Sequence, residues 1–368
     1  MAKKKIDWIL LSCVLLLIIL GLLMVFGISA PFSQESFGYT YYSLGHQIIF
    51  GILPGTIGAF LAFKVKIADL KKIALWLFLT NLVLLFLVFL PKIGFGNNET
   101  EKLGANRWIK IGSFSFQPSE FLKISFFLYL AAWLESKKND KKKKMAVAGF
   151  FLAILAPISL ALILQPDVST LSLLIMIALM MYFLSETPIL HTFLMGLIAL
   201  TIIFILIYAA PYRMRRFLAF LMPELDPMGI SYQIKQAQIA IGSGGIGGRG
   251  LGMSKQKFGF LPYPKSDSIF AVFGEETGFL GCFLLILLFF IFLVRGIDIA
   301  KKGENKFSRL LAYALTVQIV LQAFLHMSSM TGVLPLTGIP LPFISYGGTH
   351  LVVELISVGI LLNISKQN

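Results

Sequence analysis

The chain carries little charge for its length. Only 14% of its 368 residues are Asp, Glu, Lys or Arg, whereas 57% are hydrophobic and 34 are phenylalanine. A soluble domain has about 25% charged residues, so this chain has too few to cover a water-facing surface. Its mean hydropathy of +0.84 and several uncharged runs long enough to cross a bilayer indicate a polytopic membrane protein and exclude a soluble enzyme.

Cysteine and acidic residues are also scarce. The two cysteines, Cys13 and Cys282, both fall in apolar runs, a spacing that indicates neither a disulfide framework nor a metal site. The chain has 18 acidic residues and 32 Lys and Arg, which gives a net charge of +14. Such an excess can indicate a nucleic-acid partner, but in a membrane protein basic residues hold cytoplasmic loops inside and meet anionic lipid. We therefore expect no nucleic-acid partner.

Hydropathy predicts an all-α polytopic membrane protein of about ten transmembrane helices. With the N-terminus inside, most Lys and Arg fall on one side, which predicts that both termini are cytoplasmic. Segments 92–118 and 210–267 then become extracytoplasmic loops too long to be simple connectors, the larger one between spans 7 and 8. Residues 1–368 form a single membrane domain, with predicted spans at 8–28, 46–64, 73–91, 119–135, 146–164, 168–185, 188–209, 268–294, 310–330 and 343–363.

A glycine-rich run occupies positions 242–252. Its first part matches the pattern G-x-G-x-x-G, but a dinucleotide site also needs a strand before it and a helix after it. Here the run lies between membrane spans, so we reject that function. Two interpretations stay open: a mobile turn, or a nest of backbone N–H groups that contacts phosphate, with Arg249, Lys255 and Lys257 beside it.

Ionisable residues at span boundaries are candidate site residues, because a charge in hydrocarbon costs about 2.5–3.5 kcal/mol and needs a partner or a function. Glu120 and Lys123 open the fourth span three residues apart, either as an ion pair that staples the helix end or as part of a polar cavity. Asp167 starts the sixth span, as a helix cap or a cavity residue. His350 and Glu354, four residues apart in the last span, are expected to pair within the bundle.

Asp267 is the strongest candidate for catalysis. It lies where the second long loop enters the eighth span, after Pro262 and Pro264 and before an apolar run. A carboxylate at such a boundary can act as a general base when desolvation raises its pKa towards neutral. The alternative is a cap at the start of a membrane helix.

Seven blocks between residues 104 and 348 resemble, in order, the SEDS family of membrane proteins, the FtsW/RodA group. The blocks are 104–109, 116–123, 165–167, 211–216, 232–252, the segment around Asp267, and 341–348. The chain departs from the family pattern near the acid, where Tyr263, Lys265 and Ser266 replace the usual Glu, His and Thr.

The resemblance implies an inverting glycosyltransferase that polymerises lipid II, the undecaprenyl-pyrophosphate-linked disaccharide-pentapeptide, into peptidoglycan at the outer face of the cytoplasmic membrane. It implies Asp267 as the catalytic residue. No cofactor is certain, and a divalent cation, Mg²⁺ or Mn²⁺, is one alternative for stabilising the leaving pyrophosphate. The candidate residues for substrate, pyrophosphate or the cavity are Arg107, Glu120, Lys123, Asp167, Arg213, Arg215, Arg216, Lys257 and Ser345.

The resemblance also implies partners: lipid II, the undecaprenyl-pyrophosphate-linked glycan, a class B penicillin-binding protein with FtsI-like transpeptidase activity, and other divisome proteins. Blocks 211–216 and 254–257 look more like the division member than the elongation member. We therefore expect a multi-pass protein of the cytoplasmic membrane at the division septum. Three rivals stay open: a lipid II flippase whose buried charges line a translocation path, a RodA-like elongation polymerase, and a catalytically silent division scaffold.

Overall fold

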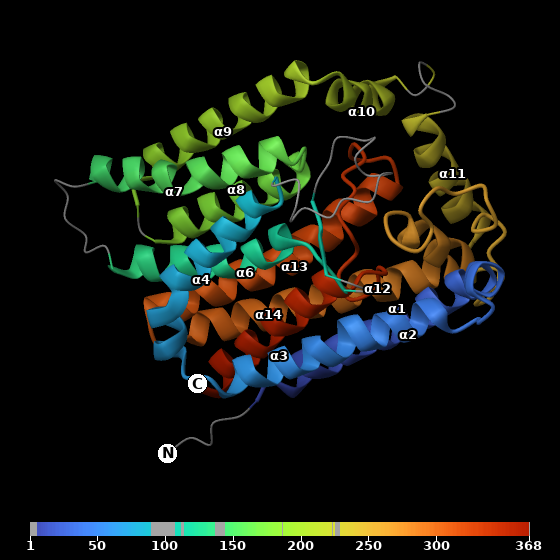
Figure 1. The fold of residues 1–368 in the computed structure, drawn as a ribbon, viewed down its shortest axis with the longest axis horizontal. Coiled ribbons are helices and arrows are strands. Elements are labelled where there is room, and N and C mark those ends of the chain that lie inside the picture. Colours follow the sequence, from blue (N-terminus) through green and yellow to red (C-terminus); the bar gives the residue numbers. More distant parts are fainter. Residues whose placement is uncertain are drawn as a thin grey trace.

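The computed structural model describes residues 6–89, 107–111, 114–136, 144–185, 187–222, 224 and 229–367. In these segments the chain forms a bundle of long helices (Figure 1). A small antiparallel hairpin, β1 (Ile109–Ile111) and β2 (Phe114–Phe116), pairs Ile109 with Phe116. Most of the predicted loop 92–118 lies outside the described residues.

Each predicted span coincides with a helix or a run of helices. In the described part of the chain, eight of these segments have the length and hydropathy to cross a membrane. The other two are α8, which has 17 residues, and α6, which carries Glu120 in its first turn. The segments are α1 (Trp8–Phe37), α2 (Tyr42–Gln47) with the π-helix η1 (Ile48–Ile52) and α3 (Leu53–Lys64), α4 (Ile67–Leu87), α6 (Pro118–Ser136), α7 (Lys144–Leu164), α8 (Val168–Leu184), α9 (Ile189–Ala209), α12 (Ile269–Lys302), α13 (Lys306–Met330) and α14 (Gly348–Gln367).

Helix α14 is largely buried, whereas helix α9 has almost no buried residues. α14 packs against α3 and α13, and small residues allow this close approach, since a Cβ on Gly359 would lie 2.3 Å from the Ala59 carbonyl oxygen. Small residues at helix contacts are typical of membrane bundles, where association depends on close packing. The exposed apolar side chains of α9, among them Leu200 and Phe204, are suited to contact lipid.

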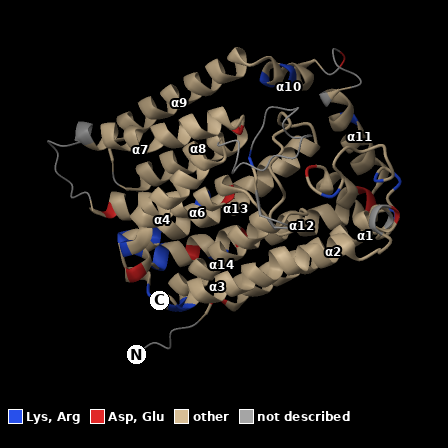
Figure 2. Ribbon diagram, viewed as in Figure 1, with Lys and Arg blue, Asp and Glu red and all other residues tan. Residues whose placement is uncertain are grey.

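The first helix begins and the last helix ends at the same end of the bundle. The Asp7 N–H donates to Ser365 Oγ at 3.4 Å, and the Asp7 carboxylate pairs with Arg295 at 2.6 Å. Lys71 pairs with Glu135 at this end, and Figure 2 shows Lys and Arg gathered near the C-terminus. The structure thus places the start of the first helix and the end of the last on one side of the bundle, as the prediction requires; by the positive-inside rule this would be the cytoplasmic end, and the orientation stays a prediction.

The segment between α9 and α12 is partly helical, which corrects its prediction as a loop. It contains α10 (Pro211–Leu221) and α11 (Ile230–Ser243), at the end of the bundle opposite the C-terminus (Figure 1). Both helices are short and amphipathic, so a search for long apolar runs does not detect them. Helix α12 is interrupted at Gly278, whose φ is 66° and ψ −164°. Its first turns therefore form a short helical piece of their own.

Candidate active site

A polar cavity of about 340 Å³ lies among the starts of α6 and α8, helix α10, the segment before α12 and the segment before α14. These parts of the chain are distant in sequence, and the bundle brings them together at the end opposite the termini. Six of the predicted site residues line the cavity: Arg107, Glu120, Lys123, Asp167, Arg216 and Asp267.

Asp267 is held by the backbone of the segment that leads into α12. Ser268 Oγ donates to the Pro262 carbonyl at 2.8 Å, and the Ser268 N–H donates to the Tyr263 carbonyl at 3.1 Å. Gln233 of α11 donates to Ser268 Oγ at 3.0 Å. Ser268 occupies the N-cap position of α12, and no side chain caps the helix there. The cap interpretation of Asp267 is therefore wrong, and its half-buried carboxylate faces the cavity.

Burial raises the pKa of the Asp267 carboxyl above its ordinary value. A side-chain hydrogen bond with Ser266 and the charges of Arg216 and Arg107 oppose this rise. Desolvation disfavours the charged form of a carboxyl, while nearby cations favour it. The Asp267 carboxylate is consequently a stronger base than an exposed aspartate, and two guanidinium groups help to keep it ionised.

Arg216 reaches the cavity from α10. Its Nη1 donates to the Leu336 carbonyl at 3.3 Å, and its Cζ lies 4.7 Å from the centroid of the Tyr212 ring. Gly338 leaves space between the charged groups, since a Cβ there would lie 3.8 Å from Asp267 Oδ2 and 3.9 Å from Arg216 Nη1. Its φ of +67° is also one that glycine adopts without strain. Nothing in the sequence around Gly338 marked it as a site residue.

Arg107 and Asp167 organise the reversal between α7 and α8. Arg107 Nε donates to the Gln165 carbonyl at 2.9 Å, and its Nη2 donates to the Pro166 carbonyl at 2.6 Å. These bonds use two of the five guanidinium N–H groups. Asp167 caps α8 by accepting the Thr170 N–H at 3.3 Å, and it also lines the cavity. The two interpretations of Asp167 are thus compatible.

Glu120 and Lys123 form a buried ion pair at the start of α6. Lys123 Nζ lies 2.9 Å from both carboxylate oxygens of Glu120 and donates to Gln322 Oε1 of α13 at 3.2 Å. An ammonium group has three N–H donors, so Lys123 is already satisfied within the bundle. The pair joins two helices and lines the cavity, and it acts on a ligand chiefly through charge.

Three predicted residues lie beside the cavity rather than on its surface. Ser345 is fully buried and donates to the Ser266 carbonyl at 2.9 Å, which ties the segment before α14 to the segment that carries Asp267. Arg213 donates to the Leu206 carbonyl at 3.0 Å and lines a neighbouring apolar pocket. Arg215 is exposed on α10.

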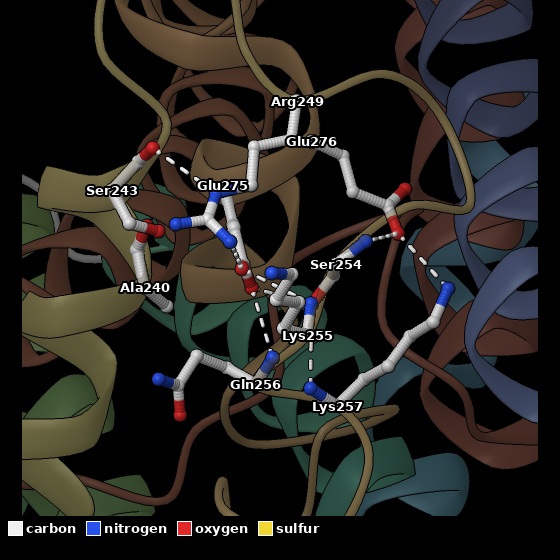
Figure 3. Close-up of polar contacts among 9 residues, drawn as sticks. All are labelled: Ala240, Ser243, Arg249, Ser254, Lys255, Gln256, Lys257, Glu275 and Glu276. Atoms are coloured by element: carbon white, nitrogen blue, oxygen red, sulfur yellow. Dashed lines mark hydrogen bonds and ion pairs between the residues drawn. The ribbon is translucent and has the colours of Figure 1, made fainter.

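Lys257 belongs to a different polar cluster, which Figure 3 shows. Its Nζ pairs with Glu276 at 3.2 Å and donates to the carbonyls of Gly27 and Gly252 at 2.9 and 2.7 Å. Its side chain is 1% exposed. All three ammonium donors are therefore used inside the protein, and the structure does not support the predicted contact of Lys257 with substrate.

The glycine-rich run packs on the first turns of α12. The N–H groups of Arg249 and Gly250 donate to backbone carbonyls of this helix at 3.0 Å. The N–H groups of Lys255 and Gln256 donate to the Glu275 carboxylate at 3.0 and 3.2 Å. These amides do bind an anion, but the anion is a carboxylate of the same chain. The phosphate-nest interpretation is therefore wrong for these groups.

His350 and Glu354 do not pair as predicted. Glu354 Oε2 accepts the Phe343 N–H at 2.8 Å, while Glu354 Oε1 and His350 Nε2 have no hydrogen-bond partner in the described part of the chain. Their spacing places them on one helix face, but the turn before α14 competes for the glutamate. His350 lines the cavity instead, as do Tyr212 and Tyr346; sequence reasoning missed all three as cavity residues.

The departures from the family pattern lie at different places in the site: Ser266 lines the cavity and is a hydrogen-bond partner of Asp267, whereas Lys265 lies at its edge. Lys265 Nζ lies 4.7 Å from the centroid of the Tyr346 ring, and Tyr346 OH lies 3.0 Å from His46 Nδ1. Burial lowers the pKa of Lys265. The substituted residue is thus supported by an aromatic wall of the cavity rather than by direct contact with Asp267.

The described residues form no preassembled metal centre. No group of three or more His, Cys, Asp or Glu side chains among them is placed to hold a metal ion. In the cavity the Glu120 carboxylate is already ion-paired, which leaves Asp167 and Asp267. A divalent cation held by protein side chains usually needs more oxygen ligands than this, so the cavity alone does not fit one.

The fold and the site define a class of protein: a polytopic helical membrane protein with an acid-containing polar cavity at one end of its bundle. The chain belongs to the cell cycle protein family, the FtsW, RodA and SpoVE group, whose profile matches residues 7–368.

Two curated relatives match over nearly the whole chain. A probable peptidoglycan glycosyltransferase FtsW of Geobacter sp. (strain M18) is 39% identical over 363 residues, covering 98% of this chain and 97% of the relative. Stage V sporulation protein E of Bacillus subtilis (strain 168) is 36% identical over 366 residues, covering 100% and 98%.

Solved structures share the fold. A chain in "Structural coordination of polymerization and crosslinking by a peptidoglycan synthase complex" has a TM-score of 0.79 and 27% identity, covering 99% of this chain and 98% of its own. The rod shape determining protein RodA of Thermus thermophilus has a TM-score of 0.71 and 24% identity, covering 99% and 97%, and supports the fold alone.

Proposed function

We propose that this chain is a peptidoglycan glycosyltransferase that polymerises lipid II into glycan strands at the outer face of the cytoplasmic membrane. The observation that carries the proposal is the Asp267 carboxylate, which has a raised pKa and faces a polar cavity that Arg107 and Arg216 also line. The names of the relatives, which include probable peptidoglycan glycosyltransferase FtsW, support the same reaction class.

In the proposed reaction Asp267 acts as the general base. It removes the proton from the 4-hydroxyl of the incoming lipid II, and the hydroxyl oxygen attacks the anomeric carbon of the other substrate. The bond from that carbon to the pyrophosphate oxygen breaks, and undecaprenyl pyrophosphate leaves. An α-linked donor thereby gives a β-1,4 linkage in one step, with inversion and without a covalent enzyme intermediate.

The cations of the cavity would stabilise the departing pyrophosphate. Arg216 and Arg107 are the best placed, because both side chains line the cavity. Each guanidinium group is also held in position by a hydrogen bond to a backbone carbonyl. Fixed charges of this kind need little reorganisation when negative charge develops.

The direct test is Asp267→Asn in a purified polymerisation assay with fluorescent lipid II. The matched control is Asp69→Asn, an exposed acid of α4 at the opposite end that pairs with Lys72. We expect the first variant to lose glycan synthesis and the second to retain it. Wild-type polymerisation by Asp267→Asn at equal protein concentration would remove Asp267 from the mechanism.

A lipid II flippase is the rival from another class, and the buried Glu120–Lys123 pair is the observation that favours it. In this chain Lys123 also donates its third hydrogen bond to Gln322. The ammonium group therefore has no donor left for a passing ligand, which favours a structural role for the pair. Liposomes separate the two functions: polymer made from outer-leaflet lipid II supports the polymerase, and headgroup transfer across the bilayer without polymer supports the rival.

We also propose that the polymerase acts at the division septum with a class B penicillin-binding protein and other divisome proteins. The FtsW names among the relatives support the division role. The likeness to a chain of a peptidoglycan synthase complex supports a crosslinking partner. The alternative is a RodA-like role in elongation. Depletion of the protein distinguishes them, because loss of a division enzyme gives filaments and loss of an elongation enzyme gives rounded cells.

A further inference from the structure

Exposed apolar side chains cover the loop between α11 and α12. Such a group of large exposed apolar residues is unusual on a water-facing surface and marks an interaction site. Each of the six largest is more than half exposed; we call them the apolar loop surface, and they are Ile246, Leu251, Met253, Phe258, Phe260 and Tyr263.

Two polar side chains of the loop point inward, while the six residues of the apolar loop surface point outward. Ser254 Oγ donates to the Glu275 carboxylate at 2.5 Å, and Lys257 pairs with Glu276 (Figure 3). Ser254 and Lys257 are each 1% exposed, whereas Phe258 is 54% exposed. A loop surrounded by water would have the opposite arrangement. Because these contacts fix the backbone, the apolar side chains have no route to the interior.

The loop continues the exposed apolar face of α12. The Phe279 N–H donates to the Gly245 carbonyl at 2.8 Å, and the Leu280 N–H donates to the Ile246 carbonyl at 3.1 Å. Phe279, Leu280 and, one turn further, Phe283 are all more than half exposed on a helix apolar enough to span a membrane. The apolar loop surface therefore begins where this face of α12 starts.

The loop also lies at the level of the outer end of α1. Lys257 Nζ donates to the Gly27 carbonyl, close to the end of the apolar stretch 8–30 of that helix. A Cβ on Gly27 would lie 3.8 Å from Gly252 Cα. Figure 1 shows the loop beside the ends of α1 and α2 that lie away from the C-terminus. By the length and composition of the α1 span, hydrocarbon would give way to headgroups at about this depth.

The charge of the loop suits anionic lipid. Residues 244–266 include no Asp or Glu but four basic residues. Lys255 is exposed, and Arg249 is partly exposed although its guanidinium group also pairs with Glu275 at 3.5 Å and donates to the Ser243 carbonyl at 3.3 Å. Apolar side chains flanked by basic ones are typical of segments that lie in the membrane interface, where they bury apolar area and contact anionic headgroups.

We propose that loop 244–263 inserts the apolar loop surface into the outer leaflet, with Arg249 and Lys255 at anionic headgroups. The loop leads directly to Asp267, so its insertion would hold that carboxylate at headgroup depth. The inference rests on the membrane topology and the loop contacts, and it stands whether or not the chain transfers glycosyl groups.

The test is spin-label accessibility in nanodiscs of phosphatidylglycerol and phosphatidylcholine. In full-length protein with Cys13→Ser and Cys282→Ser, single nitroxides replace the side chains at Phe258→Cys and Phe260→Cys. Reference labels at Phe283→Cys, on the exposed face of α12, and Lys301→Cys, at the cytoplasmic end, define the lipid and water limits. Collision with oxygen is compared with collision with a water-soluble nickel chelate, and elution volume and melting temperature show that each variant is folded.

We expect both loop labels to favour oxygen over the chelate, with ratios nearer to Phe283 than to Lys301. Ratios equal to that of Lys301 would overturn the proposal. So would labels that are water-accessible in the isolated protein and protected only when a purified transpeptidase partner is added, because the surface would then bind protein.

A charge variant tests the headgroup contact. Lys255 binds Glu275 through its backbone N–H, so Lys255→Glu changes the exposed side chain and leaves that bond in place. We expect the Phe258 label to become shallower in phosphatidylglycerol discs and to stay unchanged in pure phosphatidylcholine discs. Equal depth for wild type and variant in phosphatidylglycerol would remove the headgroup contact from the proposal.

Discussion

Two acidic sites lie near the start of α12, the pair Glu275 and Glu276 and the single residue Asp267, and they differ in how completely their carboxylates are satisfied. Glu275 and Glu276, 0% and 2% exposed, bind amides, a hydroxyl and Lys257 from the glycine-rich loop. Asp267 lies just before the helix and faces a cavity of about 340 Å³, with Ser266 as its hydrogen-bond partner and two arginines acting through charge.

The difference separates an acid that maintains the structure from an acid that is available for chemistry. Satisfied buried carboxylates have no capacity left for a ligand, and breaking their pairs leaves an uncompensated charge. A carboxylate with a raised pKa and an adjoining cavity can still accept a proton. The following predictions test that distinction, from the largest expected effect to the smallest.

Asp267→Asn should lower the polymerisation rate by about 10²–10⁴-fold, because an amide cannot accept the proton. It should not lower the melting temperature. The folded protein raises the pKa of Asp267, so the ionised form is disfavoured by folding at pH values above the ordinary pKa, and a neutral amide removes that cost. Rate and melting temperature are measured on the same preparations; a large fall in both would make Asp267 a structural acid.

Lys257→Met should lower the stability of the protein and leave its polymerisation rate unchanged, the opposite of the result expected for Asp267→Asn. It leaves the Glu276 carboxylate buried without its ammonium partner, which costs about 3–5 kcal/mol of stability, while the rate per folded molecule is retained. Adding Glu276→Gln should recover part of the loss. Denaturant unfolding measures this, with Lys72→Met as the control, because the Lys72–Asp69 pair is exposed and is worth at most about 1 kcal/mol.

Gly338→Ala should have a larger effect on kcat/KM than on the free energy of unfolding, when both effects are expressed as free-energy differences. The new Cβ would enter the space between Asp267 and Arg216, and the positive φ adds strain of about 1–2 kcal/mol. Gly38→Ala is the matched control, because Gly38 has a φ of +74° and a Cβ there would meet no atom within 4 Å. Equal effects of the two substitutions on kcat/KM would remove Gly338 from the site.

Arg216→Gln should move the acidic limb of the kcat/KM profile to higher pH. The general base must be ionised, so activity falls as pH drops through the raised pKa of Asp267. Removing a cation that favours the carboxylate raises that pKa further. Arg215→Gln, an exposed neighbour on α10, should leave the limb in place. An unchanged limb in both variants would show that Arg216 does not act on the base.

The long membrane helices could be predicted because each depends on a local property. About 20 apolar residues in sequence are enough to specify a transmembrane helix, and no distant contact is needed. Helices α10 and α11 were missed because their apolar residues lie on one face only, which hydropathy averages conceal.

The candidate site could be predicted where a charge at a span boundary was itself informative, or, for Arg107 and Arg216, where a block of the family pattern pointed to the residue. Asp267, Asp167 and the Glu120–Lys123 pair were found in the first way. Lys257 carries the same charge as Arg216, and both lie in the segment between α9 and α12, but only the folded chain shows that Glu276 satisfies it. Gly338 contributes space rather than a functional group, and space between side chains has no sequence signature.

The sequence by itself determined that this chain is a helical membrane protein, and it predicted which end faces the cytoplasm and which acid is the candidate base. Apolar run length, the distribution of basic residues and the place of one carboxylate were sufficient for that, because each acts locally or through the bilayer. The tertiary structure decided which charged side chains pair with each other inside the protein and which face a cavity. Pairing depends on distances between segments far apart in the chain, such as Lys123 and Gln322 or Lys257 and Gly27, and only packing sets those distances.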